Sequence, residues 1–243
     1  MKRLWISVVT ILFAMVMWGG GFHMKFQEHR DGYYHHGTMD PAVDREYDLW
    51  FSDGKIALSS ENFRILLDGK GHTIRFLNLE GSSYVESTLP LNLAGMAEES
   101  LAQRLAMFPV HGVVKPTEEK KIIQGVSCRG FDQESWIEYQ GERYYETETR
   151  TWVADQPFQD WDRYLPLVID LLKLENPDEE FLKAQIAMGG LAVATESVRY
   201  ADAKAIRSST TLLLAEEAEI PAELFAIPEG FEKKATLTRQ DLP

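Results

Sequence analysis

Alternating apolar and polar residues, separated by closely spaced turns, constrain the fold of this chain most strongly. Between residues 47 and 84 the two kinds of residue alternate in short runs, and turn-forming residues separate the runs at 52–54, 59–62, 68–71 and 80–82. A two-residue period is typical of strands that bury one face. The turns are too short for the crossover that parallel neighbours need. The pattern therefore predicts an antiparallel meander and excludes Rossmann-type and TIM-barrel architectures for this part.

The remaining sequence predicts further strands and two helical sections. A helix is expected at 92–107, capped by Asn92, because apolar residues recur there at three- and four-residue steps. A second helical section, 161–188, is interrupted at Asn176-Pro177. Strands are expected at 22–27, 121–126, 127–133, 135–140, 142–154, 191–200 and 206–216, with Gln140-Gly141 as a tight turn. With no repeat or linker, the sequence predicts a single α+β domain over residues 22–243.

The N-terminus has the order of features that a secretory signal requires. Lys2 and Arg3 precede fifteen uncharged residues, 4–18, and the small residues Gly19, Gly20 and Gly21 follow. As a helix, the uncharged stretch would cover only about 22 Å, less than the roughly 30 Å of a hydrocarbon core. We therefore expect residues 1–21 to be a cleaved signal peptide and the protein to be periplasmic or secreted. A retained anchor is the alternative.

Charge and cysteine content exclude several classes of function. The chain has 38 acidic and 25 basic residues, a net charge of −13. A dedicated nucleic-acid binder needs clustered Lys and Arg, so nucleic acid is not an expected partner. Cys128 is the single cysteine, which excludes an internal disulfide framework and a cysteine-rich zinc site. No later segment is apolar for long enough to predict a membrane span.

The sequence contains none of the common catalytic or nucleotide-binding motifs. HExxH, CxxC, GxSxG and P-loop patterns are missing, and the glycine-rich segments fall in hairpin turns. Cys128 has no neighbouring base to activate it. We therefore expect a protein that is not an enzyme, with no catalytic residue, no metal site and no cofactor.

The apolar face of the meander is the remaining candidate site. Two interpretations stay open, because a packed core and a ligand cavity use the same residues. In the first, the face is an ordinary core beneath the helices. In the second, it holds an acyl chain or a lipidated partner, with the helices as a lid. The ligand-binding residues expected in the second case are Leu49, Phe51, Phe63, Ile65, Leu67, Ile74, Phe76 and Tyr84.

Several segments, taken in order, resemble those of a known superfamily. They are the stretch 48–56, the turn at 68–70, the triplet 82–84, the strand end at Trp152-Val153, and the closing segments 220–225 and 227–231. This order is similar to a family of exported bacterial domains of unknown function within the LolA/LolB-like superfamily. The tail residues Leu224, Phe225, Pro228, Gly230 and Phe231 match the family's closing pattern. The resemblance covers about residues 48–231.

The resemblance implies a fold and suggests a class of function. It implies a curved, unclosed antiparallel half-barrel with helices on the concave side. Members of the superfamily carry lipoproteins, bind lipids or sense envelope signals, and the family supplies no catalytic residues to transfer. We expect a non-enzymatic envelope protein that binds a hydrophobic ligand, or a lipid or lipoprotein partner, in the half-barrel. A protein-binding or envelope-sensor module with a packed core is the alternative.

Overall fold

The computed structural model describes residues 20–35, 38–201, 204–221 and 223–242, so residues 1–19 of the expected signal peptide lie outside the described part. The helices are α1 (Leu93–Met96), α2 (Glu99–Met107), α3 (Leu165–Leu172) and α4 (Glu179–Ile186), with 3-10 turns η1 (Trp161–Arg163), η2 (Lys173–Glu175) and η3 (Arg239–Asp241). The strands are β1 (Gly21–Arg30), β2 (Tyr33–His35), β3 (Thr38–Asp40), β4 (Val43–Ser52), β5 (Lys55–Ser59), β6 (Phe63–Asp68), β7 (Thr73–Asn78), β8 (Ser83–Thr88), β9 (Val110–Ile123), β10 (Val126–Tyr139), β11 (Glu142–Ala154), β12 (Leu191–Ala201), β13 (Lys204–Ala218) and β14 (Glu232–Lys234).

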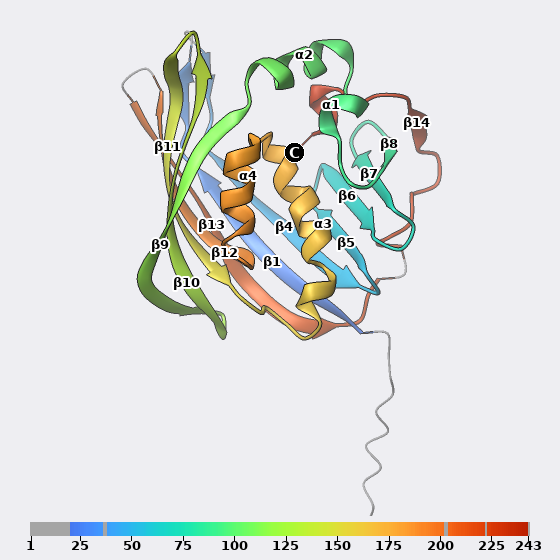
Figure 1. Cartoon of the computed structure of the whole chain (residues 1–243). Coiled ribbons are helices and arrows are strands. Elements are labelled where there is room, and N and C mark those ends of the chain that lie inside the picture. Colours follow the sequence, from blue (N-terminus) through green and yellow to red (C-terminus); the bar gives the residue numbers. More distant parts are fainter. Residues whose placement is uncertain (1–19, 36–37, 202–203, 222, 243) are drawn as a thin grey trace, which may run out of the picture.

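One large open sheet organises the molecule (Figure 1). Among the described residues its strand order is β14-β8-β7-β6-β5-β4-β1-β13-β12-β11-β10-β9. Neighbours are antiparallel except for the short parallel pair of β14 and β8. The two ends of the sheet, β14 and β9, do not pair with each other, so the sheet is not closed. The predicted antiparallel meander is confirmed as β4–β8.

Tight turns set the register of the hairpins. At Asp53-Gly54 and Gln140-Gly141 both residues have positive φ, between 48° and 81°. Two consecutive positive φ angles match the twist of the flanking strands in a two-residue hairpin. The expected turn at Gln140-Gly141 is therefore confirmed, and it joins β10 to β11.

Each face of the sheet packs against a different part of the chain. We call the face covered by α3 and α4 the helix side and the opposite face the outer side (Figure 1). The main core lies on the helix side, where the apolar residues of β4–β8 pack with α3 residues such as Leu167 and Val168. A second core on the outer side joins Leu66 and Leu77 to Leu224 in the C-terminal segment. The meander is therefore buried on both faces.

The helical sections follow the sequence signals, with one difference. The helix expected at 92–107 is split into α1 and α2, with Ala97 and Glu98 extended between them. The Asn92 side chain accepts a hydrogen bond from the Gly95 amide, so the expected cap is confirmed. The expected interruption at Asn176 is also confirmed, since it separates η2 from α4. No helix among the described residues has the length and hydrophobicity to cross a membrane.

Candidate ligand-binding groove

The residues expected to bind a ligand lie in the most tightly packed part of the sheet. Six of them are at most 5% exposed and pack in the main core beneath α3: Leu49, Phe51, Ile65, Leu67, Ile74 and Phe76. Phe63 is partly buried at the margin of the same core. None of these seven residues lines the three pockets on the helix side of the sheet that lie outside this packed core. Their role in ligand binding stays a prediction.

Tyr84 lies on the opposite face from the other seven residues. β8 begins at Ser83 and pairs Val85 with Phe76, so Val85 faces the helix side. Tyr84 pairs with Leu77 and packs in the second core on the outer side. A shift of one residue moves a side chain to the other face of a sheet. The expectation that Tyr84 shares a face with Phe76 is therefore wrong.

A groove on the helix side lies between α2 and the half of the sheet that is formed by strands β9–β13. It consists of three adjoining pockets with volumes of about 590, 470 and 360 Å³. The first two share Arg104, Ile137 and Tyr145, and the last two share Arg199 and Ile206. We call the three together the inner groove, with an apolar end, a middle and a polar end. Each pocket has a size typical of small-molecule sites.

Apolar side chains from distant parts of the sequence line the apolar end. Leu101 and Leu105 share one face of α2, because residues four apart lie on the same side of a helix, and Phe108 follows directly at the C-terminal end of α2. Ile137 of β10 and Leu174 of η2 face them. The rings of Phe108 and Tyr139 are 5.8 Å apart. This part of the inner groove offers an apolar chain a largely hydrophobic wall.

Three arginines from separate elements line the middle of the inner groove. Arg104 lies on α2, Arg199 on β12 and Arg239 on η3. Asp241 fixes η3 because its carboxylate accepts hydrogen bonds from the Thr238 amide and hydroxyl, at 2.9 and 2.8 Å. None of the three guanidinium groups has a carboxylate partner among the described residues. We call these residues the arginine triad.

A β-bulge places Tyr145 at the junction of the apolar end and the middle. The register of β10 and β11 shifts between Ser135 and Ile137, and Tyr145 lies in the bulged segment with a φ of 54°. This left-handed conformation is uncommon for a residue other than glycine and often marks functional positions. Tyr145 lines both pockets. The bulge therefore shapes the wall that the two share.

The groove also holds an acid in an unfavourable environment. Glu175 is exposed as a whole residue and presents surface to the apolar end, but the protein around its carboxyl raises the pKa of that group by desolvation, partly offset by a hydrogen bond from Gln185. Burial also raises the pKa of Tyr47 on β4 to about 12, with a smaller contribution from the nearby charge of Glu28. The interior therefore favours the neutral form of both groups.

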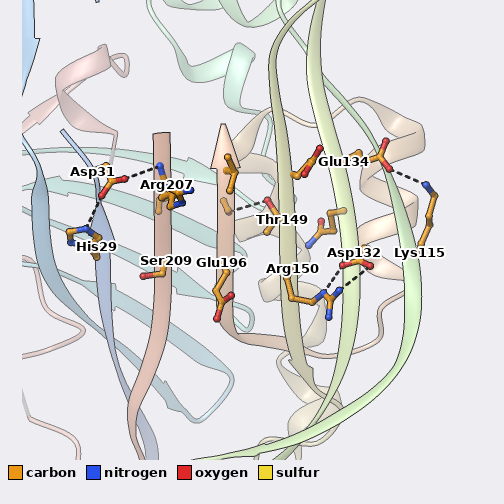
Figure 2. A pocket seen from close by; sticks show the side chains of 15 residues that line it. His29, Asp31, Lys115, Asp132, Glu134, Thr149, Arg150, Glu196, Arg207 and Ser209 are labelled. Carbon is orange, nitrogen blue, oxygen red and sulfur yellow. Dashed lines mark hydrogen bonds and ion pairs between the residues drawn. The ribbon is translucent and has the colours of Figure 1, made fainter. Parts of the chain in front are cut away.

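A second pocket, on the outer side, is polar and internally paired. It has a volume of about 730 Å³ and crosses β1 and the strands from β13 to β9 (Figure 2). Asp132 accepts a hydrogen bond from Arg150 at 2.5 Å, and Lys115 donates to Glu134 at 3.0 Å. Cross-strand ion pairs of this kind are common on solvent-facing sheets. Within the described ranges, no group of three or more His, Cys, Asp or Glu residues could hold a metal ion.

Sequence reasoning missed the inner groove, although one signal pointed to it. Apolar residues recur at Leu101, Leu105 and Phe108, along α2 and just past its end. Arg104 interrupts this apolar pattern on the same helix face. Arg199 lies 95 residues and Arg239 lies 135 residues further along the chain, so only the fold brings the triad together.

Comparisons with known proteins add little to this geometry. No family model matches the chain, and no curated protein matches it. Among solved structures, it is similar to an outer membrane lipoprotein-sorting protein domain from Vibrio parahaemolyticus, with 7% identity, coverage of 85% of this chain and 89% of that one, and a TM-score of 0.21. It is also similar to a DUF1329 family protein from Desulfovibrio piger, with 8% identity, coverage of 84% and 89%, and a TM-score of 0.22. The function therefore has to be inferred from the inner groove itself.

Proposed function

We propose that this protein is an exported, non-enzymatic envelope protein that binds a hydrophobic ligand, or the lipid chain of a partner, in the inner groove. One observation carries the proposal: the apolar end is an accessible pocket of about 590 Å³ lined by Leu105, Phe108, Ile137 and other apolar side chains. Each methylene moved from water to such a wall gains about 0.8 kcal/mol. We also propose that the sheet curves toward the side that carries the helices, as expected for a half-barrel.

The site differs from the one expected from the sequence alone. The meander β4–β8 carries the apolar face first expected to hold the ligand, and that face is packed beneath α3. A ligand there would have to displace α3, whereas the inner groove already has open volume. The ligand therefore belongs to the half of the sheet near α2. A partner-binding or sensor module without a ligand is the alternative, and the same experiment distinguishes the two.

The test is saturable binding of a fluorescent fatty acid to purified, delipidated protein. Leu105→Trp adds bulk inside the apolar end and should weaken binding at least tenfold. Met107→Trp is the matched control, because Met107 is on the same helix but is 56% exposed and does not line the groove. Saturable binding by the parent and by Met107→Trp, and not by Leu105→Trp, supports the proposal. Absence of saturable binding by the parent would favour the sensor module.

A further inference from the structure

We propose that the arginine triad binds an acidic headgroup, a carboxylate or a phosphate, so that the inner groove selects anionic amphiphiles. The inference deepens the proposed function and rests on it: the chain of the ligand occupies the apolar end and its headgroup occupies the middle. Arg104 and Arg239 line both of these pockets, so headgroup and chain sites are contiguous. One ligand can therefore reach both.

The main evidence is that three arginines without a carboxylate partner line one pocket. Five other arginines are ion-paired, in Arg45–Glu28, Arg75–Glu86, Arg129–Asp155, Arg150–Asp132 and Arg163–Asp53. Of the remaining described arginines, Arg30 and Arg143 lie over aromatic rings and Arg64 donates to backbone carbonyls. Arg104, Arg199 and Arg239 lie together without any such pair among the residues that the structure describes. The chain has 38 acidic residues against 25 basic ones, so acids are abundant. A cluster of unpaired cations in an acidic protein points to an anion from outside.

Each acidic residue near the triad either accepts a hydrogen bond from another residue or has a raised pKa that disfavours its charged form. Asp40, the acid in the middle pocket, accepts a hydrogen bond from Tyr33, and this interaction raises the pKa of the phenol. Glu28, in the polar end, is bound to Arg45 at 2.7 Å. Burial raises the pKa of Glu175 in the apolar end, which disfavours its charged form. The middle pocket therefore carries three guanidinium groups against one carboxylate.

Arginine suits this role better than lysine. Its planar guanidinium presents several donors in a fixed fork that matches carboxylate and phosphate oxygens, and it is more weakly hydrated than an ammonium. In a groove with apolar walls, the field of three such groups is focused on the space between them. A hydrogen bond to a charged group is worth enough to change affinity by roughly ten- to a hundredfold.

Competition against a fluorescent fatty-acid probe tests the inference. The competitors share one oleyl chain: oleate, oleoyl lysophosphatidic acid and neutral oleyl alcohol, with inorganic phosphate as the headgroup alone. The variants are Arg104→Gln, Arg199→Gln, Arg239→Gln and the triple variant, with Arg104→Lys retaining the charge. Arg207→Gln is the matched control, since it removes the same charge from the outer side of β13, beside Ile206 of the groove. Melting curves verify that each variant is folded.

The expected result separates headgroup from chain. The triple variant should bind oleate and the lysophosphatidic acid at least tenfold more weakly and leave oleyl alcohol unchanged, while Arg207→Gln matches the parent and Arg104→Lys falls between parent and Arg104→Gln. Equal binding of all three amphiphiles, unaffected by the variants, would overturn the inference and leave the proposed function standing. Phosphate binding that depends on the triad, without amphiphile binding, would overturn both and indicate a simple anion site.

Discussion

Glu175 provides a test of the inner groove at the scale of a single residue. Its raised pKa means that between the unfolded value, about 4.3, and the folded value, the folded state holds more protons than the unfolded state. Stability therefore falls as the pH rises through that window, and the loss persists above it. Glu175→Gln removes the charge, so the variant should melt above the parent at pH 7.5, by roughly 2–4 °C for each kcal/mol recovered.

The same variant has an internal control in its pH dependence. Below about pH 3, where a glutamic acid is almost fully protonated in both folded and unfolded chains, Glu175→Gln and the parent should melt together. The measurement is a series of melting curves from about pH 3 to pH 8. A constant difference at every pH would mean that the substitution acts through packing and not through the charge in the groove.

Alternation of apolar and polar residues predicted the core residues well, except where a turn shifted by one residue which side chains face the helix side. In the strand expected at 22–27, Phe22, Met24 and Phe26 alternate with His23, Lys25 and Gln27, and all three apolar residues contribute to the main core. Tyr84 was misplaced because the turn before β8 delivers Ser83, and not Tyr84, to the helix side. The groove residues could not be predicted in this way, because a side chain facing an open pocket leaves no periodic signal of its own.

Asn176 joins two elements that form opposite walls of the inner groove. Its side chain donates to the backbone carbonyls of Leu105 and Phe108, at 2.9 and 3.1 Å, which ties α2 to the end of η2. Its φ is 53°, a left-handed conformation that glycine also adopts readily. Asn176→Gly therefore removes the two hydrogen bonds and leaves the backbone path unchanged.

We expect Asn176→Gly to loosen α2 without affecting the meander. Two lost hydrogen bonds that leave carbonyls short of a partner cost about 1–3 kcal/mol, so amide exchange in residues 99–108 should accelerate about tenfold or more. Hydrogen–deuterium exchange with mass spectrometry measures this, and peptides covering 63–78 serve as the internal reference. Gln124→Gly, which also replaces a positive-φ residue but lies in the turn before β10, is the matched control. Equal acceleration of both regions would contradict the assignment.

Elements closed by a clear turn were predictable, and the long edge strand was not. Turn residues located the hairpins of β4–β8 because each turn needs particular backbone angles. β9 begins at Val110, earlier than the expected 121–126, and its residues up to Lys121 are mostly exposed. An edge strand with a solvated surface lacks alternation, and Pro116 is tolerated there since an edge strand has unpaired amides on one side. Alternation of apolar and polar residues reveals strands that bury one face, and β9 buries few of its side chains.

At the scale of the whole molecule, the sheet divides into two halves with different tasks. The meander β4–β8 is packed on the helix side by α3 and on the outer side by the C-terminal segment around Leu224. The strands from β9 to β13 carry the inner groove and the polar outer pocket. The charge of −13 is spread over a surface whose groove is locally basic in its middle. Composition alone could not show a basic groove in an acidic protein, because the three arginines come together only through the topology of the chain.

Phe76→Ala distinguishes the packed half of the sheet from the half proposed to bind the ligand. Phe76 is 1% exposed in the main core, and truncating a buried phenylalanine costs about 3–5 kcal/mol. This is a large share of a typical folding stability of roughly 5–15 kcal/mol. The variant should melt well below the parent, yet at a temperature where it is still folded it should bind the fatty-acid probe with the affinity of the parent. Leu105→Trp should show the reverse, with a small change in melting and a large loss of binding. If folded Phe76→Ala instead lost the probe, the ligand would occupy the face of β4–β8, and α3 would have to move aside to admit it.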